Sequence, residues 1–268
     1  MKFDSEKISN DFLELSSEQR LNILLNLTEK RLNISKLANL LNATKSEIHR
    51  NIGRLIKTGL IEKDSDGNYG LTTYGNAILI QITSLCFVSE NKPYFVTHTL
   101  GNLEPKFIHR LGALQDKKQV NGFVKVLEKW KKIHEAAEKY IFNILAEVPY
   151  TRDIIDVINS KLELGIPIHS IFAEKAVIPE DRKKIFEEKG FQKYVVDGLL
   201  ERRIKKNISV VVLVTEKEAA VFFPNTSGNP DLSTMFFSSN PDFHDWCCDY
   251  FEWCWKNSTM FHESKLKG

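Results

Sequence analysis

Residues 44–75 read "TKSEIHRNIGRLIKTGLIEKDSDGNYGLTTYG", and the periodicity of this stretch changes in the middle. Apolar residues recur at helical spacing over 45–58, which predicts a helix with one buried face. Thr44 followed three residues later by Glu47 is a capping-box pattern, and Gly59 suits a left-handed helix cap. The residues after Gly59 alternate around Asp66-Gly67-Asn68, a pattern typical of a β-hairpin. The stretch therefore predicts a helix that is followed at once by a hairpin.

The residues before this stretch predict two further helices. Ser16 with Gln19 gives a second capping-box pattern, and the leucines that follow over 21–27 have helical spacing. A short amphipathic helix is expected over 33–41, and a tight turn at 42–44 joins it to the next helix. Two helices, a turn, a basic helix and a hairpin make a winged helix-turn-helix.

The charge pattern of the third helix and the hairpin indicates DNA binding. From Lys45 to Lys63 there are five Lys or Arg residues against Glu47 and Glu62, a net charge of +3 in a chain whose overall net charge is only +2. We therefore expect a local attraction to phosphate and contacts with double-stranded DNA. The alternatives are a solvated charged face and a winged helix that binds proteins. The candidate DNA-binding residues are Lys45, Ser46, His49, Arg50, Arg54, Lys63 and Asn68.

Composition limits the class of protein. The chain has 268 residues, of which 42% are hydrophobic and 27% are charged, as is ordinary for a globular protein. We expect no membrane association, because the longest apolar run, at 209–214, is too short to span a bilayer. The first ten residues contain no apolar signal region, and the four cysteines do not form a disulfide framework. These features lead us to expect a cytoplasmic protein.

The rest of the chain is expected to form two parts. Residues 84–147 read as a helical connector that ends in a long amphipathic helix over 120–145. This helix is expected either to form a dimer seam or to dock on its own C-terminal domain. Over 148–268, predicted helices alternate with strands, which argues for an α/β domain. The expected fold is thus an α+β winged helix-turn-helix domain over 1–83, the connector, and an α/β C-terminal sensor domain.

Two groups of motifs resemble known families. The stretch "SKLANLLNATKSEIHRNIGRLIKTGLIEKDSDGNYGLTTYG", which ends in the pattern Y-x-L-T-x-x-G, resembles archaeal winged-helix regulators of the ArsR/MarR kind. The stretches "YFVTHTLGNLEPKFIHRLGAL", "VVVLVTEKEAAVFFPNTSGNPDLSTMFFSSN" and "WCCDYFEWCWKNS" look like the sensor half of archaeal methanogenesis-regulatory proteins. The resemblance covers nearly the whole chain, and it implies a transcription regulator with an α/β effector domain.

The expected C-terminal helix carries residues that are able to bind a soft metal. His244, Cys247 and Cys248 are one turn apart, while Cys254 lies about 10 Å further along the helix axis. The interleaved tryptophans and phenylalanines also suit a buried aromatic helix in which cysteines fill small gaps. Packing, redox sensing and metal binding remain the three alternatives, and we expect packing, with no metal or cofactor.

Motifs of known enzymes are missing. The chain has no G-x-x-x-x-G-K-[ST] loop and no G-x-S-x-G elbow, and His134 with Glu138 lacks the second histidine of a zinc-protease helix. None of the seven histidines is followed two residues later by lysine, as catalysis in phospholipase-D-like folds requires. We therefore expect no enzyme.

A ligand site is expected in the C-terminal domain, because ligands of α/β sheets bind beyond the carboxyl ends of strands. Those ends are expected near Phe172-Ala173 and Thr215, and Arg202 and Arg203 would attract a small anionic effector. The candidate ligand-binding residues are Arg202, Arg203, Thr215, Phe222, Trp246 and Tyr250. The sequence thus predicts a homodimeric DNA-binding regulator that senses a small molecule. The alternative is a winged-helix protein that assembles with the archaeal transcription machinery and senses nothing.

Overall fold

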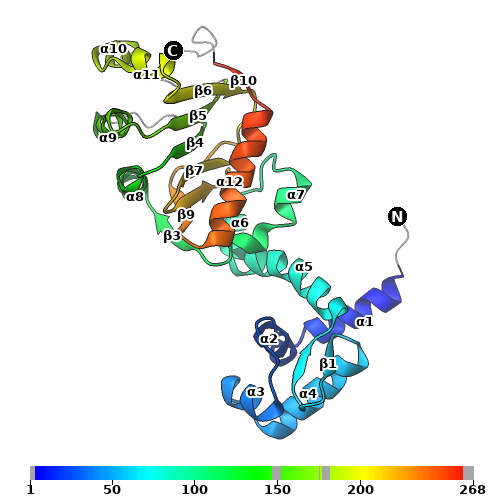
Figure 1. The fold of residues 1–268 in the computed structure, drawn as a ribbon. Coiled ribbons are helices and arrows are strands. Elements are labelled where there is room, and N and C mark those ends of the chain that lie inside the picture. Colours follow the sequence, from blue (N-terminus) through cyan, green and yellow to red (C-terminus); the bar gives the residue numbers. More distant parts are fainter. Residues whose placement is uncertain (1–3, 147–151, 175, 177–181, 262–268) are drawn as a thin grey trace. The chain divides into compact units, whose positions relative to one another are not determined.

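The computed structural model describes residues 4–146, 152–174, 176 and 182–261. The chain divides into two compact units, Met1–Thr83 (unit 1) and Ser84–Gly268 (unit 2). Figure 1 shows a helical unit 1 with a small hairpin and a unit 2 that is built on a large sheet. Among the described residues, no helix has both the length and the apolar character needed to cross a membrane.

Unit 1 begins with two helices, α1 (Ser5–Leu15) and α2 (Glu18–Asn26). Helix α1 was not expected from the sequence. The predicted capping box at Ser16 and Gln19 is wrong, because Ser17 is the N-cap of α2 and makes no side-chain capping bond. The Ser16 hydroxyl instead donates a hydrogen bond to the Leu13 carbonyl oxygen at 2.8 Å. The pattern failed because Ser16 closes the preceding helix rather than opening the next one.

The remaining elements of unit 1 follow in the expected order. Helix α3 (Ile34–Leu40) leads through a turn into α4 (Lys45–Lys57), and strands β1 (Ile61–Lys63) and β2 (Tyr69–Leu71) form an antiparallel hairpin. Leu32 adds an isolated bridge to Tyr69, so the segment between α2 and α3 extends the hairpin. Buried aliphatic side chains of α2, α3, α4 and the residue before β1 form the core of unit 1: Ile23, Leu24, Leu37, Ile48, Leu55 and Leu60.

Helix α5 (Thr73–Glu90) contains the boundary between the two units. Short helices follow in unit 2, namely α6 (Lys92–Phe95), α7 (Pro105–Ile108) and the 3₁₀ helix η1 (Leu111–Leu114). They precede the first strand of the large sheet.

Unit 2 is built on a mixed sheet of eight strands in the order β10-β6-β5-β4-β7-β8-β9-β3. The central strands β4 (Ile141–Leu145), β5 (Ile168–Ala173) and β6 (Leu200–Lys205) are parallel. The other neighbouring strands are antiparallel. These other strands are β3 (Lys118–Asn121), β7 (Val211–Thr215), β8 (Ala219–Phe222), β9 (Thr234–Ser238) and β10 (Thr259–Met260).

Helices cover both faces of this sheet (Figure 1). Helices α8 (Phe123–Ala136), α9 (Arg152–Glu163), α10 (Arg182–Glu188) and α11 (Phe191–Val196) lie on one face, which we call the α8–α11 face. Helix α12 (Pro241–Lys256) lies on the opposite face, which we call the α12 face. Unit 2 is therefore an α/β structure in which helices shield both sides of the sheet.

The expected helical connector over 84–147 is corrected by the structure. The predicted helix over 120–145 ends at Ala136, and residues 141–145 form β4 in the middle of the sheet. Strand β3, at one edge, also comes from this segment. The apolar faces of α8 and α12 pack against their own sheet, so the buried face of α8 docks within its own chain. The α/β unit therefore begins well before residue 148.

Other expected elements of the C-terminal half are confirmed. The sequence predicts a helix over 151–165 and a strand over 166–173, where α9 and β5 lie. It also predicts two strands with a turn over 209–224 and a helix that starts near Pro241, where the β7–β8 hairpin and α12 lie. Of the expected helix over 151–165, Thr151 lies outside the described residues, as do residues 179–181 at the start of a further expected helix over 179–190. Strand β6 was not predicted: the sequence indicates a basic cluster over 202–206 just before the apolar strand at 209–214, whereas Arg202 and Arg203 lie on β6 itself.

Candidate nucleic-acid interface and a cavity in unit 2

Helix α4 is fixed at its N-terminus by a complete capping box. The Glu47 amide donates to Thr44 Oγ1 at 3.2 Å, and the Thr44 amide donates to Glu47 Oε2 at 2.8 Å. The hydrogen bonds to Thr44 lower the pKa of the Glu47 carboxyl group. Before the cap, Asn42 closes the turn with a positive φ of 48°. The predicted capping box and turn are thus confirmed, and they set where α4 begins.

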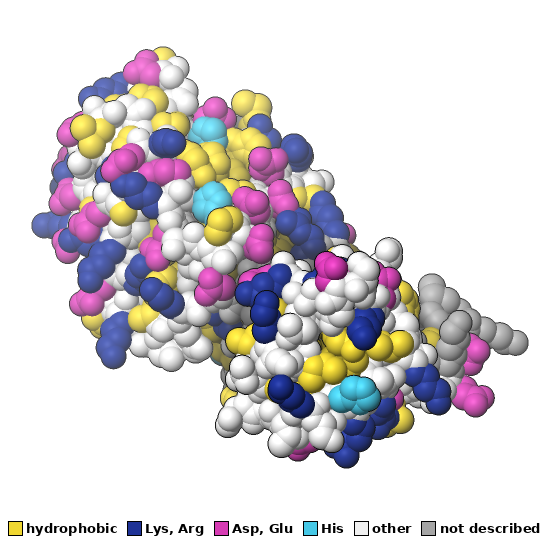
Figure 2. All heavy atoms as spheres, turned by 60° about the horizontal axis from the view of Figure 1, so that its bottom comes forward, with side chains coloured by type: hydrophobic (Ala, Val, Ile, Leu, Met, Phe, Trp, Pro, Cys, Tyr) yellow, Lys and Arg dark blue, Asp and Glu magenta, His cyan; other side chains and the backbone are white. Residues whose placement is uncertain are grey.

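The two faces of α4 differ as the sequence predicts. Ile48, Ile52 and Leu55 are at most 2% exposed, because this face packs in the core of unit 1. The candidate residues on the other face are all exposed: Lys45, Ser46, His49, Arg50 and Arg54. Figure 2 shows Lys and Arg side chains around an apolar patch on this side of unit 1. The exposed face of α4 is therefore a cationic surface, and four of these five residues lie in the first half of the helix.

Arg54 differs from the other four residues because it forms an ion pair within unit 1. Its Nε and Nη2 donate to the Glu14 carboxylate at 3.0 and 2.6 Å. Arg20 Nε lies 2.8 Å from the same carboxylate, whose side chain is only 9% exposed. Two guanidinium groups therefore hold one buried carboxylate, and they join α1, α2 and α4. Arg54 supports the position of α4 in addition to any contact that it makes outside the chain.

The hairpin has a tight tip that is organised by Asp64. The Asp64 carboxylate accepts hydrogen bonds from the amides of Asp66 and Asn68 at 3.0 and 2.8 Å. Gly67 at the tip has a φ of +79°, a conformation that L side chains rarely adopt. Lys63 is exposed on β1, and the half-buried Asn68 precedes β2. The hairpin thus presents both candidate residues from a fixed turn.

The Leu71-Thr72-Thr73-Tyr74-Gly75 stretch joins the hairpin to α5 through Thr72. The Thr72 hydroxyl donates to the Gly59 carbonyl oxygen at 2.5 Å and accepts from the Gly75 amide at 3.0 Å. A Cβ on Gly75 would lie 2.0 Å from the Leu60 carbonyl oxygen, so only glycine fits there. In the Y-x-L-T-x-x-G pattern, the threonine therefore joins the hairpin to α5 through hydrogen bonds, and the last glycine is required by the close approach of Leu60.

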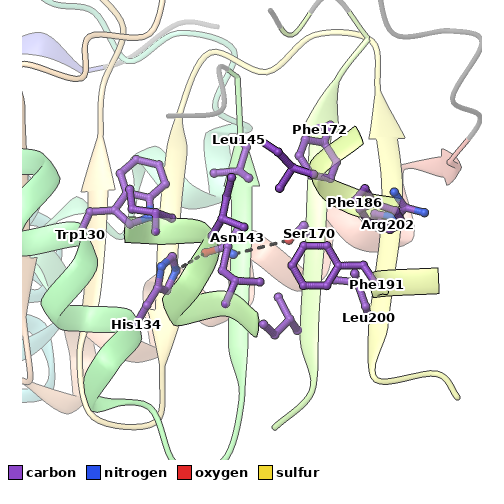
Figure 3. Close-up of a pocket in the computed structure, with 15 residues that line it drawn as sticks. Trp130, His134, Asn143, Leu145, Ser170, Phe172, Phe186, Phe191, Leu200 and Arg202 are labelled. Carbon is purple, nitrogen blue, oxygen red and sulfur yellow. Dashed lines mark hydrogen bonds between the residues drawn. The ribbon is translucent and has the colours of Figure 1, made fainter. Parts of the chain in front are cut away.

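In unit 2, three polar side chains form a row across neighbouring parallel strands. Asn143 of β4 pairs with Ser170 of β5, which in turn pairs with Arg202 of β6. Directly paired residues on parallel strands point to the same face of a sheet. His134 of α8 joins the row, since its Nε2 lies 3.0 Å from Asn143 Oδ1 (Figure 3). We call these four residues the polar row.

A cavity of about 70 Å³ lies beside the polar row on the α8–α11 face. Its walls are mainly aromatic and aliphatic, and they include Trp130, Leu145, Phe172, Phe186 and Phe191 (Figure 3). The polar groups that line it are those of His134, Asn143, Ser170 and Arg202. Desolvation lowers the pKa of the buried His134 to about 4, so the imidazole is neutral at neutral pH. The signal that the sequence offered was the presence of polar residues in two otherwise apolar strands, Asn143 in β4 and His169 and Ser170 in β5.

The six candidate ligand residues do not come together. Arg202 lines the cavity, whereas Arg203 donates to the Trp255 carbonyl oxygen on the α12 face at 3.0 Å. Trp246 and Tyr250 are buried in α12, and Trp246 Nε1 donates to the Phe107 carbonyl oxygen. Phe222 packs on Trp130 with ring centroids 5.7 Å apart. The six residues are thus divided between the two faces of the sheet.

The carboxyl ends of the strands near Phe172 and Thr215, which were expected to form one ligand site, do not lie next to each other. Thr215 pairs with Ile141 at the start of β4, because β7 runs antiparallel to β4. Phe172 lies near the end of β5, next to Leu145 at the end of β4. The carboxyl end of β5 near Phe172 therefore lies beside the end of β4, whereas the carboxyl end of β7 near Thr215 lies beside the start of β4. The Thr215 side chain is buried, and its hydroxyl donates to the Glu218 carbonyl oxygen in the turn between β7 and β8.

The cysteine-rich helix packs against the sheet. Cys247 and Cys254 are at most 1% exposed, and burial raises the pKa of the Cys254 thiol to about 11. His244 Nε2 lies 2.8 Å from the Thr215 carbonyl oxygen. Within the part of the chain that the structure describes, no group of three His, Cys, Asp or Glu residues is placed to hold a metal ion. High thiol pKa values disfavour the reactive thiolate, so this geometry favours packing.

Comparisons with known proteins give the following matches. A family model described as the HVO_A0261 N-terminal domain matches residues 10–92. TrmBL2, an archaeal chromatin protein with a novel mode of DNA binding, is 12% identical, with a TM-score of 0.41 over 91% of this chain and 94% of its own. HlyU from Vibrio cholerae is 24% identical, with a TM-score of 0.28 over 32% of this chain and 97% of its own.

NucT from Helicobacter pylori is 11% identical, with a TM-score of 0.41 over 55% of this chain and 100% of its own. No curated protein matches the chain.

Proposed function

We propose that the chain is a DNA-binding transcription regulator, whose unit 1 is a winged helix-turn-helix domain. The observation that carries this proposal is the structure of α4, which is capped, buried on one face and cationic on the other, and is followed at once by a hairpin. A helix of this kind enters the major groove with its first turns, and the hairpin contacts the neighbouring backbone. Lys45, Ser46, His49 and Arg50 would face bases or phosphates in this arrangement.

The hairpin residues Lys63 and Asn68 would contact the DNA backbone beside the groove. Lys63 is exposed, and its Nζ lies 5.8 Å from the centre of the Tyr69 ring. The ion pair with Glu14 gives Arg54 a structural role, so we assign the groove contacts first to Arg50 and Lys45. The interface is thus made by the first half of α4 and by the hairpin.

Within this proposal the protein is a cytoplasmic homodimer and not an enzyme. Two-fold DNA sites require two recognition helices at a fixed spacing. Large apolar side chains are available for a dimer contact on α1 and α5, where Phe12, Leu13 and Ile80 are each 57% exposed. Unit 2 would act as the sensor that responds to a small molecule and changes the affinity for DNA.

DNA binding is tested by fluorescence anisotropy of the full chain with a labelled duplex from the region upstream of its own gene. We expect binding that weakens as salt rises, because cationic side chains displace counterions from phosphates. A duplex of unrelated sequence should bind more weakly. Failure to bind either duplex at low salt would contradict the proposal.

A further inference from the structure

The polar row occupies positions where the surrounding sheet is apolar. On the same face, two residues toward the start of each strand, the corresponding row is Ile141, Ile168 and Leu200. Two residues toward the end, it is Leu145, Phe172 and Ile204. Apolar rows of this kind are sufficient for a sheet face that only packs against helices. Asn143, Ser170 and Arg202 therefore need a reason other than packing.

The buried members of the row form a directed chain of hydrogen bonds. His134, Asn143 and Ser170 are 1%, 2% and 5% exposed. The Asn143 amide nitrogen lies 3.5 Å from Ser170 Oγ, so Oδ1 of the same side chain faces His134 Nε2 and accepts its hydrogen. The proton of the neutral imidazole is then on Nε2, and Nδ1 has a lone pair to offer.

That lone pair is left without a partner. His134 Nδ1 is buried and makes no hydrogen bond to any described residue. A buried polar atom without a partner is costly, and it is commonly satisfied by water or by a ligand. Since His134 lines the cavity, a donor group bound beside it can supply the missing hydrogen bond.

The size and the walls of the cavity restrict such a ligand. A water molecule needs roughly 10–15 Å³ of this kind of volume, so about 70 Å³ holds a few water-sized groups. Most of the lining is apolar, which favours a short hydrocarbon body. Arg202 supplies a cation at one side, where its guanidinium group lies 4.6 Å from the Phe186 ring and 4.3 Å from the Phe261 ring. Guanidinium groups pair well with carboxylates.

We propose that this cavity binds a small hydroxy acid: a carboxylate that pairs with Arg202, a hydroxyl group that donates to His134 Nδ1, and a short apolar body against the aromatic walls. Ser170 Oγ would accept or donate a further hydrogen bond to the same ligand. The proposal specifies the ligand class and the place of sensing for unit 2, and only its regulatory meaning rests on the proposed function.

The test is isothermal titration calorimetry of the full chain, without DNA, against straight-chain and branched 2-hydroxy acids from lactate to 2-hydroxy-4-methylpentanoate. Each acid is compared with its primary amide and with the acid that lacks the hydroxyl group. We expect at least one hydroxy acid to bind about tenfold more tightly than either analogue, because the amide loses the charge that pairs with Arg202 and the other analogue loses the hydrogen bond to His134.

Two variants and one matched control place the binding in this cavity. Arg202→Met removes the charge but keeps an apolar chain beside the two rings, and Ser170→Ala removes only a hydroxyl group. Both should weaken acid binding by about tenfold. Arg203→Met changes the neighbouring residue of the same strand, whose side chain lies on the α12 face, and should leave binding unchanged. Thermal melting of each variant establishes that it is folded.

Four results would overturn the proposal. One is that no hydroxy acid in the series binds. Another is that acid and amide bind equally, and a third is that Arg203→Met weakens binding as much as Arg202→Met and Ser170→Ala do. A crystal soaked with the best acid that shows only water in the cavity would also overturn it. Because DNA is absent throughout, none of these results bears on DNA binding by unit 1.

Discussion

Arg54 of α4 and Glu14 of α1 form a bidentate ion pair, with Nε–Oε2 and Nη2–Oε1 distances of 3.0 and 2.6 Å. The sequence alone placed Arg54 among the DNA contacts, because it lies on the exposed face of α4. The structure shows that the same side chain also holds a carboxylate from a helix that precedes it by about forty residues. This contact leads to different expectations for Arg54 and Arg50.

Replacing Arg54 with alanine should lower the melting temperature of unit 1, because the buried Glu14 carboxylate would keep only Arg20 as its partner. The salt dependence of DNA binding should stay nearly unchanged. Thermal unfolding followed by circular dichroism, together with anisotropy titrations, measures both quantities. Lys57→Ala, on the same helix, is the control for loss of one positive charge. A variant with unchanged melting and a salt slope reduced by about one would instead make Arg54 a phosphate contact.

Gly75 and Gly53 should respond in opposite ways to replacement by alanine. Gly75→Ala places a Cβ against the Leu60 carbonyl oxygen and should destabilise unit 1 by about 1–3 kcal/mol. Gly53 lies on the exposed side of α4, and a Cβ added there would meet no atom within 4 Å, so Gly53→Ala should stabilise unit 1 by up to about 1 kcal/mol. Urea unfolding of the two variants measures the difference. Equal changes in the free energy of unfolding would show that the close approach of Gly75 to the Leu60 carbonyl oxygen does not affect stability.

Most local patterns of unit 1, though not the capping box at Ser16 and Gln19, could be predicted from the sequence because each depends on neighbouring residues. The capping box at Thr44 and Glu47, the positive φ of Gly59 and the turn at Gly67 are all set within a few residues. Helix α1 was missed, although its apolar Phe12 and Leu13 were visible, because no capping pattern marked its start.

The errors in unit 2 have a different physical cause. The segment after Ala136 continues with good helix formers and has no Gly or Pro before β4, so apolar spacing alone did not show where α8 ends. The polar row could not be predicted either, because it depends on the register of three strands. Asn143, Ser170 and Arg202 are far apart in the sequence and meet only in the sheet.

Stability should depend on pH through His134. Its pKa is lowered by desolvation from 6.5 to about 4 in the folded protein, so the unfolded chain binds the proton first as pH falls. The contribution of His134 to stability is therefore constant above pH 6.5 and decreases between pH 6.5 and 4, by up to about 1.4 kcal/mol per pH unit. Urea unfolding at several pH values should show this slope, and His134→Gln should reduce it. An identical slope in the variant would exclude His134 as its source.

The proposed homodimer should be visible in light scattering as twice the chain mass of 30.9 kDa. Phe12→Glu together with Leu13→Glu should give a monomer, because charges would replace exposed apolar side chains on α1. Leu40→Glu, at an equally exposed leucine of α3, is the control. A wild-type protein that is monomeric at micromolar concentration and keeps full affinity for DNA would contradict the proposed homodimer.

DNA binding through α4 is measured by the affinity for double-stranded DNA as a function of salt, for the wild type, Arg50→Ala, and Arg50→Ala with Lys45→Ala. Both side chains are exposed on the first half of α4. If this helix enters the groove, each lost phosphate contact should reduce the slope of log affinity against log salt by about one. We expect a slope reduced by about one for the single variant and by about two for the double variant, with melting temperatures unchanged. Wild-type affinity and slope in the double variant would contradict DNA binding through α4.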